Sequence, residues 1–269
     1  MRFILFGKWE DNMEKIKIEK QSGVLVATLS TPEKRNVLDE KMIAEITEVF
    51  TEESKDKRLK VALIQGEGEI FCAGGDLRWM KEKGELKYDE NLADARKLAQ
   101  MYESIWKFPV PVIVKVQGGA FGGGVGFLAV SDISICEKNA KFRTPEVKIG
   151  LIPAVISVFL LRKIGMSNLK FLALTGKEID AFEAQKIGLI NIVCEKDELD
   201  KKVNEIIEEI KSNSGYAVRK TKELIMKIFD SSFSYSLDLA SHFLAEARAG
   251  KDAKEGISAF FEKRKPKFD

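Results

Sequence analysis

Glycines gather in one segment of the chain, residues 118–126, which follows an apolar run and precedes a run typical of a short helix. Glycine lets a ligand approach main-chain N–H groups closely, and the N–H groups at a helix N-terminus readily donate to an anion. A second segment, residues 71–77, has the same order of strand, paired glycines and a helix start at Asp76. Two such loops could direct two N–H groups at one oxygen atom. That arrangement is an oxyanion hole, and it needs no histidine.

The pattern Gly124-x-Gly126-x-x-Ala129 in the first of these segments also fits the GxGxxA fingerprint of dinucleotide-binding folds. In such a site the first glycine stands at the strand end, and an acidic residue follows about 20 positions later. Here six residues separate Gln117, at the strand end, from Gly124, and Glu137 comes only 13 positions after Gly124. The spacing disfavours a nucleotide site. Tight helix–sheet packing is the other interpretation of these glycines.

The histidine and cysteine content excludes several kinds of site. With one histidine, His242, a single chain can build neither a two-histidine metal site nor a histidine acid/base pair. Cys72, Cys136 and Cys194 form no CxxC pair, which excludes a zinc ribbon or a thioredoxin-like motif. A catalytic triad would depend on His242, in the helical tail, and no basic residue adjoins Cys72 in the sequence. We therefore expect no metal and no redox cofactor.

The composition is that of an ordinary globular chain. The 269 residues are 45% hydrophobic and 32% charged, and 44 basic residues against 42 acidic ones give a net charge of +2. This balance gives no support for a nucleic-acid partner, although a local basic site for a phosphorylated ligand remains compatible with it. The longest uncharged run, residues 116–131, is shorter than the ~20 residues of a membrane span. The apolar patch near the N-terminus is too short for a signal peptide. We expect a cytoplasmic protein.

Strands and helices alternate through the first two thirds of the chain. Ser22-Gly23 marks a turn between two short strands, Asp39 caps a helix, and Pro109 ends another helix that covers residues 91–106. Four apolar runs predict further strands, at residues 61–66, 112–118, 132–137 and 189–193, the last preceded by a helix that starts at Asp180 and stops at Gly188. Two of these runs end in Gln-Gly, 52 residues apart. The pattern predicts a parallel or spiral α/β core.

The same patterns divide the chain into three regions. Regular patterning begins just after Met13, so residues 1–12 are interpreted as an N-terminal extension. Residues 13–196 form the expected catalytic core. Residues 197–269 are predicted to be entirely helical, with helices near 215–229, 236–249 and 252–264. With no strand to complete, this tail is expected to pack on the core or on another subunit.

Several ordered motifs resemble those of the enoyl-CoA hydratase/isomerase (crotonase) superfamily, over residues 14–269. They are Gln65-Gly66, Phe71-Cys-Ala-Gly-Gly-Asp-Leu77, Gly122-Gly-Gly124, Pro145-Glu-Val-Lys-Ile-Gly-Leu-Ile-Pro153, Leu174-Thr-Gly176 and the ending Phe260-Phe-Glu-Lys-Arg-Lys-Pro266. The resemblance implies a spiral of ββα repeats followed by a C-terminal helical trimerisation region, and hence a homotrimer or hexamer. It also implies an acyl-CoA thioester substrate, so that coenzyme A enters as part of the substrate and not as a cofactor.

The resemblance also implies catalytic residues. By position in the family's motifs, Gly75 and Gly123 would donate the two oxyanion N–H groups to the thioester carbonyl. Glu146 matches the family's catalytic glutamate, and burial beside the glycine loop would raise its pKa toward that of a general acid/base. The alternative for Glu146 is a loop glutamate that pairs with Lys148.

A further set of residues is implied for substrate binding. The loop from Ala73 through Gly74 and Asp76 to Leu77 would line the path of the adenine and pantetheine groups. Three basic residues match positions where the family places charges near the coenzyme A phosphates. They are Arg35, Arg78 and Lys263, and Lys263 would come from a neighbouring subunit. A solvated surface charge is an equally good interpretation of these three.

The chain departs from the two-glutamate hydratases at Gly126, where those enzymes carry their second glutamate. Three interpretations stay open: a one-glutamate enoyl-CoA isomerase, a hydratase of branched, carboxylated enoyl-CoAs, or a slow enoyl-CoA hydratase of broad range. The motifs most resemble the second type, exemplified by 3-methylglutaconyl-CoA hydratase of leucine breakdown, and Gly126 would then leave room for a larger acyl group or for water. Hydration is the leading expectation. A non-catalytic coenzyme A-binding scaffold is the alternative of another class, and the presence of Glu146 disfavours it.

Overall fold

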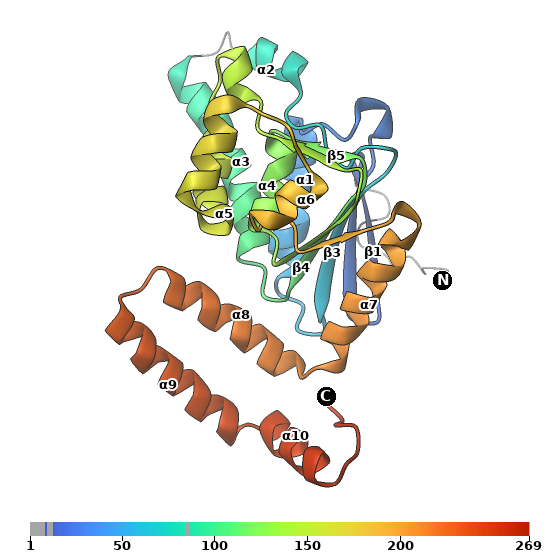
Figure 1. Cartoon of the computed structure of the whole chain (residues 1–269), viewed down its shortest axis with the longest axis vertical. Helices are drawn as coiled ribbons and strands as arrows, with labels where there is room; N and C mark the ends of the chain where they lie inside the picture. Colours follow the sequence, from blue (N-terminus) through green and yellow to red (C-terminus); the bar gives the residue numbers. More distant parts are fainter. Residues whose placement is uncertain (1–8, 10–12, 84–86, 269) are drawn as a thin grey trace.

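A six-stranded sheet with the order β1-β2-β3-β4-β6-β9 forms the centre of the computed structural model, which describes residue 9 and residues 13–83 and 87–268 (Figure 1). β1 and β2 are an antiparallel hairpin around Ser22-Gly23, both with positive φ, and the remaining strands run parallel to β2. The strands are β1 (Ile16–Gln21), β2 (Val24–Leu29), β3 (Val61–Gly66), β4 (Val112–Val116), β6 (Ile133–Glu137) and β9 (Ile192–Cys194). The predicted spiral α/β core is confirmed.

A second layer forms where the chain leaves the large sheet. After short turns β4 leads into β5 (Gly119–Phe121) and β6 into β7 (Lys141–Arg143), and these two pair with β8 (Ile179–Asp180) in the order β5-β7-β8. Two single parallel bridges, Leu38 with Gly75 and Cys72 with Ala120, add the equivalent segments of the earlier repeats. The two glycine loops therefore lie side by side, although they are some fifty residues apart in the sequence.

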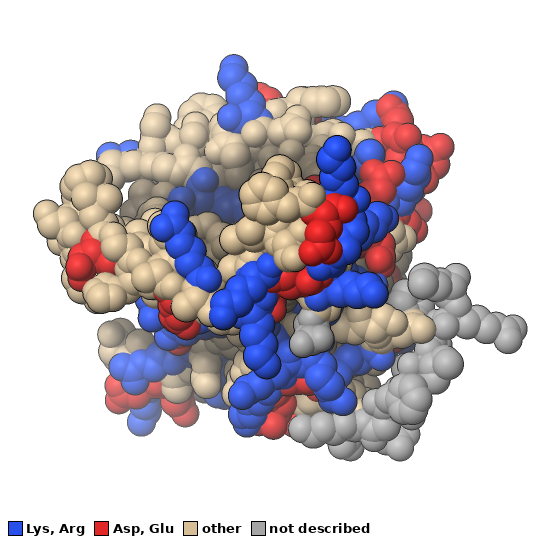
Figure 2. Space-filling view, turned by 90° about the horizontal axis from the view of Figure 1, so that it is seen from below, with Lys and Arg blue, Asp and Glu red and all other residues tan. Residues whose placement is uncertain are grey.

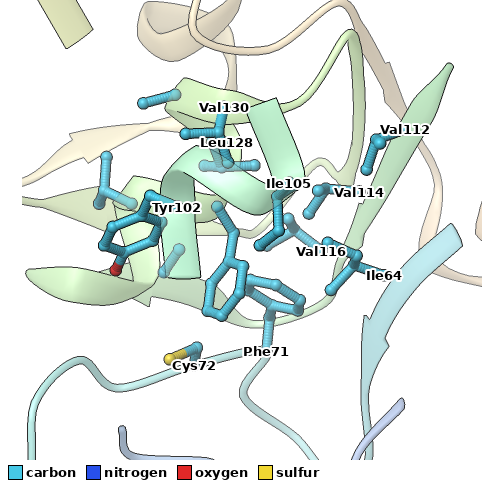
Figure 3. Packing of buried hydrophobic residues seen from close by; sticks show 14 of the residues in the cluster. Ile64, Phe71, Cys72, Tyr102, Ile105, Val112, Val114, Val116, Leu128 and Val130 are labelled. Atoms are coloured by element: carbon cyan, nitrogen blue, oxygen red, sulfur yellow. The ribbon is translucent and has the colours of Figure 1, made fainter. Parts of the chain in front are cut away.

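Helices cover both faces of the large sheet. Alternate residues of β3 point to opposite faces of the sheet. Ala62 and Ile64 belong to the larger core cluster on one face, and Val61 and Leu63 belong to the smaller cluster on the other. The larger cluster, part of which Figure 3 shows, is completed by α1, α3, α4 and α5, and the smaller one by α7. These helices are α1 (Glu40–Glu53), α3 (Tyr88–Trp106), α4 (Gly123–Val130), α5 (Ala154–Thr175) and α7 (Leu199–Ser212).

The sequence patterns did not predict every element. The 22-residue helix α5 was not anticipated, because exposed apolar residues such as Val158 and Phe171 leave it without a polar face that would give a helical period. The strand predicted at residues 189–193 is β9, which begins only at Ile192. The three strands of the second sheet are too short to show an alternating pattern.

The C-terminal helices α8 (Gly215–Phe229), α9 (Phe233–Ala249) and α10 (Lys251–Phe261) lie at one end of the molecule, beneath the sheet in Figure 1. Viewed from that end, basic and acidic side chains are interspersed with uncharged ones (Figure 2). Among the described residues no helix is long and apolar enough to cross a membrane. The expected extension, residues 1–12, lies outside the described residues except for Trp9, whose buried indole N–H donates to Glu53 Oε1 at 2.9 Å.

Buried Asn36 joins the segment before α1 to the first glycine loop. Its Nδ2 lies 2.9–3.1 Å from the carbonyl oxygens of Glu67, Ile70 and Phe71, and its Oδ1 accepts from the Thr31 N–H at 2.9 Å. Its φ of 53° is in the left-handed region, where asparagine is among the better-tolerated residues. One side chain thus fixes the course of the chain toward residues 71–77.

Replacing this side chain should destabilise the fold. We expect Asn36→Ala to lower the free energy of unfolding by about 2–4 kcal/mol, because several buried main-chain groups lose their partner and alanine disfavours positive φ. Chemical denaturation measures the change. Asn204→Ala, at an exposed position of α7, is the matched control and should stay within about 0.5 kcal/mol of wild type. An equally small change for Asn36→Ala would contradict the role given to its side chain.

Candidate active site

Two main-chain N–H groups are left without a secondary-structure acceptor where the glycine loops meet. In the bridge to Gly75, the Leu38 N–H donates to the Gly74 oxygen at 2.7 Å and the Leu38 oxygen accepts from the Asp76 N–H at 3.0 Å. The N–H of Gly75 therefore points away from Leu38, and within the described part of the chain it has no acceptor. Gly123 is the first residue of α4, so its N–H has no acceptor inside the helix.

The two loops approach so closely that only glycine fits between them. A side-chain carbon at Gly123 would lie 3.8 Å from the Gly75 nitrogen, so the two residues are close neighbours. A side-chain carbon at Gly74, where φ is +94°, would lie 2.6 Å from the Phe121 oxygen and 3.4 Å from the Gly123 nitrogen. Real side-chain carbons essentially never approach other atoms to 2.6 Å. The absence of side chains is what brings the two N–H groups to one place.

Glu146 adds a carboxylate to this junction. It begins the 3₁₀ turn Glu146–Ile149 between β7 and α5, and a side-chain carbon at Gly122 would lie 3.1 Å from its Oε1. Its Oε2 is buried and has no hydrogen-bond partner among the described residues. Burial among apolar groups raises the pKa of Glu146, opposed by a hydrogen bond from its own main chain. A carboxyl with a raised pKa suits proton transfer near neutral pH.

The alternative partner, Lys148, does not engage Glu146. The residues that the structure describes show no ion pair between the two. The aliphatic part of the Lys148 side chain lies against Gly176, where an added side-chain carbon would come within 3.0–3.5 Å of it. Glu146 is therefore left free to face the glycine loops.

All three groups line one cavity of about 260 Å³. Its other described lining residues are apolar apart from main-chain atoms and one indole N–H, and they are Leu38, Ile43, Trp79, Ala95, Leu98, Leu151, Ile152, Pro153, Ala154, Val155 and Ile156. Glu146 is the one ionisable side chain in this set. Trp79 Nε1 is buried and, among the described residues, unpartnered. The cavity therefore suits an apolar group attached to a polar carbonyl.

A larger cavity, of about 610 Å³, lies elsewhere, between α8 and the core. It is lined mainly by apolar side chains, and its charged residues Asp132 and Lys222 already pair with each other at 2.6 Å. No described group in it is free for acid/base work, so the smaller cavity is the candidate active site.

The residues expected along the coenzyme A path are only partly brought together. The Ala73 N–H donates to the Arg35 carbonyl oxygen at 2.9 Å, which places the exposed Arg35 beside the first glycine loop. Asp76 caps α2 (Leu77–Lys83), its Oδ1 accepting from the N–H of the exposed Arg78 at 2.9 Å. Gly74 is buried within the loop, and Leu77 is 59% exposed. Lys263 follows α10, which lies at the opposite end of the molecule from α2 (Figure 1).

The room expected beside Gly126 is absent, which corrects that expectation. A side-chain carbon at Gly126 would lie 2.5 Å from Tyr102 Cζ and 2.7 Å from Ile156 Cγ2, so these two side chains already fill the space. Tyr102 was not singled out from the sequence. The available signal was a glycine inside an apolar helix, which often marks close approach by a large neighbour.

Two residues that the sequence disfavours as catalytic groups, His242 and Cys72, take no part in the candidate active site. His242 is exposed on α9, 3.7 Å from Asp238 one turn earlier. Cys72 is buried, its thiol directed at the Asn36 oxygen 3.1 Å away, and burial raises the pKa of that thiol to about 12. A thiol in this state is a poor nucleophile.

Fold and site together define a class of enzyme, in which two glycine-loop N–H groups and one carboxylate surround an apolar cavity of a spiral α/β core. The comparison with known families gives the same result. The profile of the family described as "Enoyl-CoA hydratase/isomerase" matches residues 19–269. The chain belongs to this family of enzymes.

Individual relatives agree along nearly the whole chain. It is 33% identical over 255 residues to the short-chain-enoyl-CoA hydratase of Clostridium acetobutylicum, covering 94% of this chain and 97% of the relative. It is 32% identical over 257 residues to the crotonyl-CoA hydratase of Syntrophomonas wolfei, covering 95% and 98%. The crystal structure of an enoyl-CoA hydratase from Shewanella pealeana superposes with a TM-score of 0.90 at 34% identity, covering 96% and 97%.

The raised pKa of Glu146 predicts a pH-dependent effect on stability. Above its raised pKa the buried carboxylate is ionised at a cost to the folded state, so Glu146→Gln should raise the thermal midpoint there. As the pH falls through the raised pKa toward the usual 4.5, wild-type Glu146 takes up its proton and the difference should vanish. Thermal unfolding over a pH series tests this. Glu178→Gln, at an exposed position, should give no such pH-dependent gain. A Glu146→Gln effect that does not change with pH would contradict the prediction.

Proposed function

We propose that this chain is an enoyl-CoA hydratase that adds water to a 2-enoyl-CoA thioester and catalyses the reverse dehydration. The observation that carries the proposal is the meeting of Gly75, Gly123 and Glu146 on one apolar cavity. The named activities of the Clostridium and Syntrophomonas relatives support it.

In this mechanism the thioester oxygen accepts hydrogen bonds from the Gly75 and Gly123 N–H groups. As water adds to the β-carbon, the Glu146 carboxylate accepts its proton and negative charge develops on the thioester oxygen, giving an enolate. Glu146 then donates the proton to the α-carbon, so the same carboxyl serves both steps on one face of the double bond and the addition is syn. Each oxyanion donor typically contributes ~10²–10³ in rate.

The apolar lining of the cavity supports an aliphatic acyl group, and the motif resemblance favours a branched one. The 3-methylglutaconyl preference favoured by the sequence motifs needs a partner for the distal carboxylate. The described lining offers the buried N–H of Trp79 and no cationic side chain. We therefore propose a branched 2-enoyl-CoA, with 3-methylglutaconyl-CoA as the carboxylated substrate to be tested.

A second candidate, a one-glutamate enoyl-CoA isomerase, is favoured by one observation. Glu146 is the single ionisable side chain among the described lining residues, and moving a proton between two carbons of one substrate needs only one carboxylate. Isomerase and hydratase differ in whether a water molecule enters the reaction.

Turnover of a small substrate panel tests the proposed function. The ultraviolet absorbance of the conjugated thioester should fall with crotonyl-CoA or 3-methylglutaconyl-CoA if the chain is a hydratase. It should rise with a 3-enoyl-CoA, without hydration of the other two, if the chain is an isomerase. Glu146→Gln should lower turnover by ~10²–10⁴-fold while acyl-CoA binding persists, and Glu178→Gln should leave turnover unchanged. A Glu146→Gln rate within about threefold of wild type would overturn the role of Glu146.

We further propose that residues 197–269 form an oligomerisation region joined to a catalytic core of residues 13–196. Large apolar side chains remain exposed there, among them Phe233 of α9 at 79% and Phe260 and Phe261 of α10 at 78% and 77%. Exposed apolar area of this kind is typical of an interface. In the assembly Lys263 would approach the coenzyme A phosphates of a neighbouring subunit, beside that subunit's Arg35 and Arg78.

Light scattering in solution tests the assembly. We expect a mass three or six times the 30.2 kDa of one chain, because burial of these side chains between subunits is favourable. A fully active monomer would contradict both the oligomer and the inter-subunit role of Lys263.

A further inference from the structure

Tyr102 of α3 is fully buried directly behind the oxyanion glycines. Its ring packs edge-on against Phe127 of α4, with centroids 5.8 Å apart. Figure 3 shows it in the same cluster as Phe71 and Cys72, the residues that lead into the first glycine loop. Its hydroxyl donates to the Gly123 carbonyl oxygen at 2.5 Å. The one polar atom of this side chain is thus committed to a residue of the proposed oxyanion hole.

The hydroxyl lies close to Gly123, which is itself a close neighbour of Gly75 in the other glycine loop. A side-chain carbon at Gly123 would lie 3.3 Å from the Tyr102 hydroxyl oxygen and 3.8 Å from the Gly75 nitrogen. Burial, and then the nearby Cys72 and Glu146, raise the pKa of Tyr102 well above its usual range, so the hydroxyl keeps its proton and remains a donor.

The ring of Tyr102 also determines which residue can stand at position 126. A side-chain carbon there would lie 2.5 Å from Cζ and 2.7 Å from Cε1 of the ring. On the other side it would lie 2.7 Å from Ile156 Cγ2. Both neighbours are held in the core, so neither can swing aside as an exposed side chain would. Position 126 is therefore restricted to glycine as long as the tyrosine is present.

We propose that Tyr102 is a positioning residue for the reaction: its hydroxyl fixes Gly123 in the orientation that presents its N–H to the thioester oxygen, and its ring excludes any side chain from position 126. The inference rests on the proposed function of the site. Tyr102 does not touch the substrate, because it is fully buried and outside the cavity lining. It acts through the main chain of Gly123.

Tyr102→Phe isolates the hydroxyl, since the ring and its packing on Gly126 remain. We expect kcat to fall about tenfold, less than the ~10²–10³ of losing a whole donor, with KM within twofold. Tyr88→Phe, at an exposed position of the same helix, is the matched control and should leave both constants unchanged. An unchanged kcat for Tyr102→Phe, or a raised KM alone, overturns the proposal.

Infrared spectroscopy of a bound thioester gives a readout that loss of stability would not move. Butyryl-CoA labelled with ¹³C at the carbonyl has no double bond to hydrate, so it reports how strongly the oxyanion groups polarise that carbonyl. Wild type and Tyr88→Phe should lower the carbonyl stretching frequency relative to free thioester, and Tyr102→Phe should lower it less. Equal frequencies in Tyr102→Phe and wild type overturn the proposal.

Gly126→Ala tests the ring independently. The added methyl group must displace Tyr102, so we expect the same reduced carbonyl shift and a fall in kcat of tenfold or more. The double variant Tyr102→Phe/Gly126→Ala should lose little more than Gly126→Ala alone, because both changes act on the same contact. If the losses in kcat of the two single variants add in the double variant, the proposed link between Tyr102 and Gly126 is overturned. If Gly126→Ala does not fold, Tyr102→Phe decides alone. Failure of the proposed function is distinct, because wild type itself would then neither turn over an enoyl-CoA nor shift the butyryl-CoA carbonyl.

Discussion

Main chain packed directly against main chain is the constraint on which the rest of this structure depends. A side-chain carbon at Gly118 would lie 2.0 Å from the Glu69 oxygen, and one at Gly124 would lie 2.5 Å from the Cys72 oxygen. Contacts this close join successive repeats of the spiral without intervening side chains. They allow two N–H groups from different repeats to lie close to one small volume. Side chains from α2, α3 and α5 then help to enclose the cavity.

The constraint also shapes the electrostatics of the site. A cavity walled by apolar side chains and main chain contains little to stabilise an ionised carboxylate, so the pKa of Glu146 rises. Because the cavity has few polar side chains, the glycine N–H groups are the main donors available to a substrate oxygen. In the proposed function, acid/base strength and oxyanion stabilisation would therefore have one physical origin, the scarcity of polar side chains at the junction of the loops.

Much of this could be predicted from the sequence, because the signals are local. The glycine loops, the buried strands β3 and β4 and the helix cap at Asp39 each show in a short window of residues, and the family resemblance pointed to Glu146. The features that were not predicted depend on contacts between distant residues. Nothing near Tyr102 in the sequence indicates that its ring covers Gly126, and the Asn36 side chain meets its acceptors more than thirty positions away. Helix α5 lacked a periodic signal because it leaves apolar side chains exposed.

The contact between Tyr102 and Gly126 bears on how this lineage can evolve. Two of the four glycine codons differ from a glutamate codon by one nucleotide, so few nucleotide changes separate glycine from glutamate at position 126. In the folded protein a side chain at position 126 meets both Tyr102 and Ile156, so the change requires both neighbours to give way. Replacing the tyrosine by a smaller residue removes its hydroxyl from Gly123. If Tyr102 has the proposed positioning role, either change made alone should lower activity. The order of the substitutions, more than their number, therefore decides whether a carboxylate can be gained at position 126.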